Sequence, residues 1–230
     1  MPNIARHSDN ERFSINPGTE HLILCEGRDD ESFLLHYINS SIFSDYDRSV
    51  VQVDQMGGVD KMPAFVKTLP SQDGFSRLRS LLIIIDADKN PSSARDKVKG
   101  ALQRAGLPFP GAEHQWSKKG ALKTGYLLFP SCDEQSQAGA LEDLCWELLN
   151  EKYGPLIRGE VDGFIGSLEA DGKRTIKHRM KSLLHTYFSA TEELIASGIG
   201  RASEAGVFDW TSLNLDALRD FLVDMMNPTI

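Results

Sequence analysis

Leu81-Leu82-Ile83-Ile84-Ile85-Asp86-Ala87-Asp88 is the clearest strand signal of the chain and indicates its architecture. Its apolar run stops at a carboxylate, which is typical of a buried parallel strand that delivers a charged side chain to the carboxyl edge of a sheet. Leu22-Ile23-Leu24-Cys25-Glu26-Gly27 follows the same pattern. Because ligands of open α/β folds bind at that edge, the two stretches predict a group of carboxylates there.

Strand and helix patterns alternate along the first two thirds of the chain. Strands are expected at 21–25, 50–53, 81–85 and 126–129, with helices from residue 28, around 62–69, at 92–104 and at 138–150. This alternation predicts an α/β fold, with a mostly parallel, Rossmann-like sheet covered by helices on both faces. After about residue 154 strand signals fade, and helical patterns at 173–189 and 213–226 predict an α-helical C-terminal appendage. We therefore expect a polar arm over 1–18, an α/β domain over 19–155 and a helical region over 156–230.

The bulk composition restricts the compartment and the partners. The chain has 230 residues and a formal net charge of −8, which argues against nonspecific polyanion binding over the whole surface. No apolar run approaches the roughly 18 residues of a membrane span, and the first residues have no apolar core of a signal peptide. Three cysteines without a C-x-x-C pair favour a reducing compartment. We expect a cytoplasmic protein with no membrane partner.

The acidic residues at the two strand ends have the chemistry of a magnesium site. Mg²⁺ prefers hard oxygen ligands and is usually held by one or two carboxylates together with water and substrate phosphate. Asp86 and Asp88 lie two residues apart, so both fall on one side of an extended segment. Glu26, Asp86 and Asp88 are therefore the predicted ligands of Mg²⁺, with Mn²⁺ as a substitute.

Glu26-Gly27-x-x-Asp30, followed about sixty residues later by Asp86-x-Asp88, resembles the Toprim signature. That signature is shared by topoisomerases, bacterial primases, RecR-type repair proteins and OLD-type nucleases. The resemblance covers roughly residues 20–150 and implies that Glu26 assists proton transfer at a phosphodiester while the aspartate pair binds Mg²⁺. Asp30 fits the signature as an auxiliary residue, although an aspartate in the first turn of a helix also serves as a cap.

Later segments resemble a small stand-alone prokaryotic group within that superfamily, the domain-of-unknown-function family 3226. The segments are Gly125 to Pro130, Gly139 to Leu144, Phe208-Asp209 and Leu215 to Leu222. The resemblance implies that Glu142 is a further metal ligand, whereas position alone would make it a solvated charge. The chain has no Walker loop, zinc ribbon or helicase-like segment, so it is not expected to act alone as a topoisomerase or primase.

The stretch 173–181 carries five formal positive charges and no acid. Lys173, Lys177 and Lys181 recur every four residues, which predicts that they share one face of a helix. A solvated basic face is the ordinary interpretation of such a pattern. Its single sign also favours contact with a nucleic-acid backbone.

Three functions follow from these patterns. The first is a Mg²⁺-dependent phosphodiester-processing protein, most simply a nuclease acting on DNA or RNA. The second is a non-catalytic module that binds nucleic acid or docks a partner with the help of a metal. The third is a small-molecule phosphoryl-transfer enzyme, which explains Glu26-Gly27 poorly. Nucleic acid is the expected partner, and an oligomer or a protein partner is left open.

Overall fold

The computed structural model describes residues 13–131, 137–170, 172, 175–191, 194 and 198–227. Within them, one sheet has the strand order β2-β1-β3-β5-β4. Its strands are β1 (His21–Cys25), β2 (Val51–Gln55), β3 (Ser80–Asp86), β4 (Ser117–Lys119) and β5 (Leu122–Phe129). The pairs β1–β2, β1–β3 and β3–β5 are parallel, and only β4 runs antiparallel to its neighbour. The predicted α/β fold with a mostly parallel sheet is confirmed.

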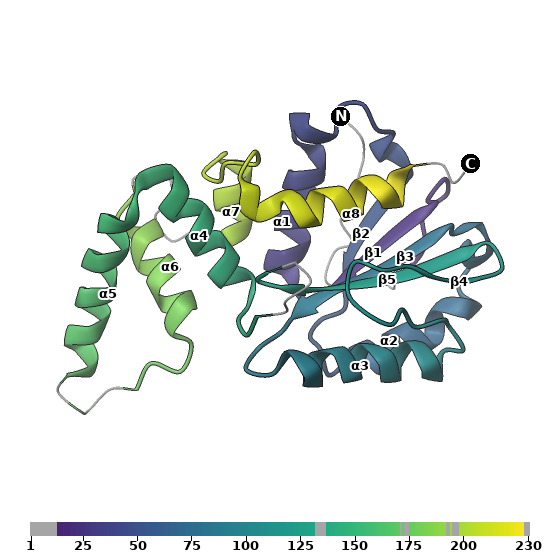
Figure 1. Ribbon diagram of the computed structural model, residues 1–230, viewed down its shortest axis with the longest axis horizontal. Helices are drawn as coiled ribbons and strands as arrows, with labels where there is room; N and C mark the ends of the chain where they lie inside the picture. The colour runs from purple at the N-terminus through teal and green to yellow at the C-terminus, as the bar shows by residue number, and fades with distance from the viewer. Residues whose placement is uncertain are drawn as a thin grey trace.

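Helices alternate with the strands, and the described elements after β5 are all helical (Figure 1). They are α1 (Arg28–Asn39), α2 (Met62–Thr68), α3 (Pro91–Arg104), α4 (Leu141–Tyr153), α5 (Pro155–Glu169), α6 (Arg179–Ser189), α7 (Ile199–Glu204) and α8 (Asp216–Met226). Short 3-10 turns lie at Ser41–Phe43, Arg48–Val50, Leu69–Ser71, Phe75–Arg77 and Leu213–Leu215. None of the helices in the described part of the chain has both the length and the apolar character required to cross a bilayer.

The sheet separates two apolar cores, as strand alternation requires. Leu22, Leu24 and Ile83 face the layer made by α2 and α3. Their neighbours Ile23 and Leu82 face the opposite layer, which includes α1, α4, α7 and α8. Figure 1 shows α2 and α3 below the sheet and α1 and α8 above it. Helices therefore cover both faces, and the carboxyl edge of the sheet is left to polar residues.

The C-terminal region is helical, as predicted. Its helices form two groups, one beside the sheet and one over it. Helices α4, α5 and α6 pack against one another at one side of the sheet (Figure 1). Helix α8 instead lies over the sheet, where Phe221 stacks on Trp116 with ring centroids 4.4 Å apart. Lys123 Nζ also donates to the carbonyl oxygen of Asp224 at 2.8 Å. The division of the chain at residue 155 stays a prediction.

The predicted helix 173–189 is wrong in its first part. Helix α6 begins at Arg179, while Lys177 and His178 precede it in a bend, and Lys173 lies outside the described residues. A run of positive charges is unfavourable at the positive N-terminal end of a helix, which accounts for the late start. Lys177 and Lys181 therefore do not share one helical face. Strand β4 and helices α5 and α7 were not predicted.

Candidate functional site

The acidic residues singled out from the sequence lie on neighbouring elements at the carboxyl edge of the sheet. Glu26 directly follows β1, and Asp86 is the last residue of the adjacent strand β3. Asp30 lies in the first turn of α1 and Glu142 in the first turn of α4. Parallel pairing of β1 with β3 places both strand ends at one edge, and the two helices start there. Asp88 follows Asp86 in the connection to α3 and is exposed.

Electrostatic coupling shows that four of these carboxylates share one region. Burial, followed by the charges of Asp30, Glu26 and Glu142, raises the pKa of Asp86 to about 8. Burial, together with the smaller effects of Glu26 and Glu142, raises the pKa of Asp30 to about 7. The pKa of Glu26 is raised by burial and, to a lesser extent, by Asp88. We refer to Glu26, Asp30, Asp86 and Glu142 as the carboxylate cluster.

Two oxygen atoms of the carboxylate cluster are buried without a hydrogen-bond partner. They are Glu26 Oε2 and Asp30 Oδ1. The other oxygen of Asp30 accepts the backbone N–H of Gly27 at 3.0 Å, so Asp30 caps α1 with one oxygen only. A buried carboxylate oxygen without a donor is costly. A cation or a proton bound to these two oxygens would lower that cost.

Helix α4 is anchored to the cluster through its first backbone N–H. The N–H of Leu141 donates to Asp86 Oδ1 at 2.9 Å, and it opposes the rise in the pKa of Asp86. Before the helix, Asp88 and Gly139 exchange two backbone hydrogen bonds of 2.8 and 2.7 Å. These contacts hold the start of α4 beside Asp86 and bring Glu142 to the site.

A glycine is needed at position 139 for the backbone before α4 to lie this close to Asp86 and Asp88. Its φ of +143° is a conformation that L side chains rarely adopt, and an added Cβ would lie 2.9 Å from Asp143 Oδ2 and 3.0 Å from Pro130 Cγ. The sequence analysis missed the contribution of Gly139 and Leu141. A backbone N–H leaves no mark in a sequence, although the unusual glycine is a signal that could have been weighed.

The donor set fits a magnesium ion only in part. Within the described ranges, no three or more His, Cys, Asp and Glu side chains are grouped so that they could hold a metal ion together. Mg²⁺ does not require such a group, because it is commonly bound through one or two carboxylates and completes its octahedron with water and phosphate. The two unpartnered oxygens of Glu26 and Asp30 suit that mode. Full ligation by the predicted residues would need their side chains to move.

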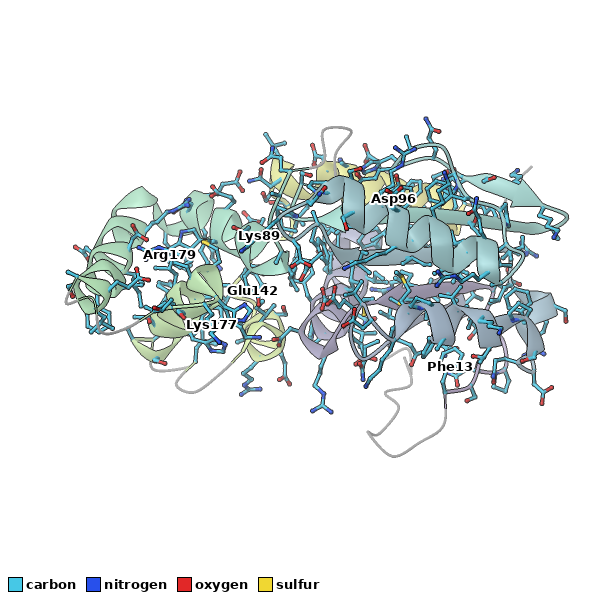
Figure 2. All side chains as sticks on the ribbon, turned by 90° about the horizontal axis from the view of Figure 1, so that it is seen from below. Phe13, Lys89, Asp96, Glu142, Lys177 and Arg179 are labelled. Carbon is cyan, nitrogen blue, oxygen red and sulfur yellow. The ribbon has the colours of Figure 1, made fainter. Side chains whose placement is uncertain are left out.

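Lys181 is the lysine of the basic stretch that approaches the cluster. Its Nζ lies 3.7 Å from Glu142 Oε1 and 3.9 Å from Asp29 Oδ2. Figure 2 shows Glu142 between the sheet and the segment that carries Lys177 and Arg179. Lys177 is exposed, whereas Arg179 is paired with Asp162 at 2.8 Å and also with Glu169. The predicted contacts of Lys173, Lys177 and Lys181 with nucleic acid stay predictions.

Comparison with known proteins gives one family match. The family described as "Protein of unknown function (DUF3226)" matches residues 20–227. No curated protein matches the chain. Similar solved structures are three of the C-terminal region of the Xanthomonas campestris pv. campestris OLD protein, phased with platinum, iodine and mercury. Their identities to the chain are 15%, 17% and 16%, with TM-scores of 0.43, 0.43 and 0.41. Each covers 90% of this chain, and the chain covers 94%, 96% and 96% of theirs. Likeness at this level carries no conclusion about activity.

Proposed function

Because the chain belongs to the family "Protein of unknown function (DUF3226)", whose description states no reaction, we propose its function from its own residues. The proposed function is Mg²⁺-dependent processing of phosphodiesters, most simply as a nuclease acting on DNA or RNA. The observation that carries it is the pair of buried, unpartnered oxygens, Glu26 Oε2 and Asp30 Oδ1, inside a cluster of mutually repelling carboxylates. The resemblance of Glu26-Gly27-x-x-Asp30 and Asp86-x-Asp88 to the Toprim signature supports the same interpretation.

The ion would be held by Glu26, Asp86, Asp88 and Glu142, with Asp30 close by. When bound, Mg²⁺ would polarise the scissile phosphate and lower the pKa of an attacking water. Residues of the chain would orient the ligands of the ion and accept the proton. Asp86 is oriented by the N–H of Leu141. Glu26 keeps one oxygen without a donor and can accept a proton, and its raised pKa suits it to that exchange.

Lys181 would reduce the negative charge that a phosphate meets at the cluster. Its ammonium lies within 4 Å of both Glu142 and Asp29, and the side chain is 51% exposed. A lysine in this position can turn from the carboxylates toward a substrate phosphate, because neither distance is that of a tight hydrogen bond.

Cleavage of labelled DNA and RNA in the presence of Mg²⁺ or Mn²⁺ tests the proposal. We expect the wild-type protein to cleave at least one of them, and Asp86→Asn to lower the rate by about a hundredfold or more. Asp96→Asn is the matched control, because Asp96 is an exposed aspartate on α3, away from the cluster (Figure 2). The nuclease proposal is wrong if no nucleic acid is cleaved under any of these conditions, or if both variants cleave as the wild type does.

A non-catalytic, nucleic-acid-binding module is the second candidate. It is favoured by the lack, within the described ranges, of three metal-binding side chains already grouped for an ion. In that case Asp86→Asn would leave nucleic-acid binding unchanged, whereas Lys177→Glu together with Lys181→Glu would abolish it. Binding measured at several salt concentrations separates this candidate from the nuclease, since contacts to phosphate weaken steeply with salt.

A further inference from the structure

A cavity of about 490 Å³ lies between α3, the segment 111–115 and β5. Its polar lining comes from Ser92, Arg95, Glu113, His114, Gln115 and Tyr126. None of the carboxylates of the cluster lines it. A volume of this size is within the range of cavities that bind small molecules and cofactors.

Hydrogen bonds fix the walls of the cavity. Strand β4 pairs with β5 only as far as Thr124, so the rest of β5 has no strand neighbour on that side within the described residues. Segment 111–115 covers this edge, and the buried Glu113 accepts the N–H of Leu128 at 2.9 Å. Arg95 Nη2 donates to the carbonyl oxygen of Gly111 at 2.6 Å and joins α3 to the same segment. The cavity is therefore formed before any ligand arrives.

One end of the cavity lies towards the carboxyl edge of the sheet, because Pro91 and Ser92, which line it, begin the helix that follows the Asp86–Asp88 connection. Tyr126 is three residues before Phe129, which pairs in register with Asp86. At about 3.3 Å per residue, Tyr126 is therefore about 10 Å along β5 from the level of Asp86. Ser92 follows Asp88 by four residues and lies in the first turn of α3. A chain molecule with one phosphate at the cluster could place a neighbouring unit in the cavity.

We propose that this cavity is a subsite for one nucleotide of a single-stranded polynucleotide whose scissile phosphate lies at the carboxylate cluster. The inference rests on the proposed phosphodiester chemistry and names where the neighbouring nucleotide binds. Arg95 has five N–H donors and uses them on the carbonyl oxygen of Gly111 and on the hydroxyl of Tyr126, so others remain for a phosphate oxygen. The hydroxyl of Ser92 lies beside it at the positive end of α3.

The charge of the lining favours a diester over a free nucleotide. Arg95 and Glu113 contribute one charge of each sign, so the lining suits the single negative charge of a phosphodiester linkage better than a triphosphate. Burial raises the pKa of Tyr126, which keeps its hydroxyl protonated as a donor. Together with the amide of Gln115 and the carboxylate of Glu113, it provides both donors and acceptors for the edge of a base. A phosphate alone would leave most of the volume unused.

Binding of a fluorescein-labelled DNA octamer and of the same RNA, measured by anisotropy in EDTA, tests the subsite. We expect Arg95→Gln to weaken binding about tenfold and to reduce the dependence of log Kd on log salt by about 0.7, as for one lost phosphate contact on a single strand. Ala112→Trp, at an exposed position lining the cavity, should weaken binding similarly by filling it. Arg104→Gln, an exposed arginine on the same helix, should stay within twofold of wild type.

Competition identifies the ligand class. A dinucleoside monophosphate should displace the octamer from the wild-type protein, and displacement by ATP or inorganic phosphate alone would overturn the assignment. If both Arg95→Gln and Ala112→Trp bind with wild-type affinity, the subsite proposal is wrong. That result would hold even if Asp86→Asn abolishes cleavage and the nuclease proposal stands. Conversely, binding that depends on the cavity in a protein that never cleaves would support the subsite and remove the nuclease.

Discussion

Buried polar groups are hydrogen-bonded at the amino edge of the sheet, whereas two carboxylate oxygens at its carboxyl edge have no donor. At the amino edge, His21 Nδ1 lies 2.7 Å from Ser80 Oγ, and Thr19 Oγ1 donates to Gln52 Oε1 at 2.9 Å. Gln52 Nε2 donates in turn to the carbonyl oxygen of Ser14 and to Asp54 Oδ2. At the carboxyl edge, Glu26 Oε2 and Asp30 Oδ1 are buried and have no donor.

This difference separates polar residues that are paired within the fold from polar residues that are left without a partner. Paired groups at the amino edge recover the free energy of desolvation through their hydrogen bonds. At the carboxyl edge, burial and then the neighbouring carboxylates raise the pKa of Asp30 and Asp86, so the cost of desolvation is not recovered there. Such groups are candidates for a functional site, because side chains with strongly shifted pKa values gather at functional sites.

The largest effect is expected at the amino edge. Gln52→Leu removes hydrogen bonds to Asn16, Thr19, Ser14 and Asp54, and it leaves buried polar groups without their partner. We expect the free energy of unfolding to fall by about 3 kcal/mol in urea titrations. Gln103→Leu, at an exposed position on α3, should change it by less than about 0.5 kcal/mol. Equal effects of the two variants would contradict a structural role for the paired groups.

The next largest effect is expected at Asp30, where a substitution should raise the free energy of unfolding. Because the pKa of Asp30 in the folded protein is about 7, above its value in the unfolded chain, stability from this group is full below pH 4 and is lost as pH rises through 7. Asp30→Asn cannot ionise and should stabilise the metal-free protein by about 2 kcal/mol at pH 8, with little effect near pH 4. Urea titrations at both pH values measure this. Destabilisation at pH 8 would mean that Asp30 serves only as a helix cap.

A divalent cation should relieve the carboxyl edge and leave the amino edge unaffected. At pH 8 we expect millimolar Mg²⁺ to raise the melting temperature by roughly 2–4 °C. The rise should be smaller at pH 6, because protons held by Asp30 and Asp86 compete with the ion. Differential scanning calorimetry checks both values. A rise that is independent of pH, or that persists in Asp86→Asn, would place the ion elsewhere.

The smallest effect is expected at Lys181. Its side chain is 51% exposed and its contacts with Glu142 and Asp29 are long, so Lys181→Met should change the free energy of unfolding by less than about 0.5 kcal/mol. A double-mutant cycle with Glu142→Gln measures the coupling directly. Lys67→Met, an exposed lysine on α2, gives the background. A coupling above about 1 kcal/mol would make Lys181 a structural partner of the carboxyl edge.

The elements predicted well are those whose own residues carry the signal. The strand at His21–Cys25 was predicted to the residue, and the helix at Pro91–Arg104 within one residue, because apolar runs and the Asn90-Pro91 start are local features. Strand β4 is polar and only three residues long, so no apolar pattern marks it. In α5, three glycines (Gly159, Gly163 and Gly166) weaken the helical pattern, and packing against α4 and α6 supports the helix.

Short stretches of sequence are enough to predict which residues end the buried strands, because an apolar run followed by a carboxylate is a local pattern. It therefore predicted Glu26, Asp86 and Asp88 as neighbours along one edge. Tertiary structure alone decided which carboxylate oxygens are left without donors, how Leu141 and Gly139 bring α4 to Asp86, and where Lys181 lies. These outcomes depend on backbone groups and on contacts between distant segments, and no short stretch of sequence contains both partners.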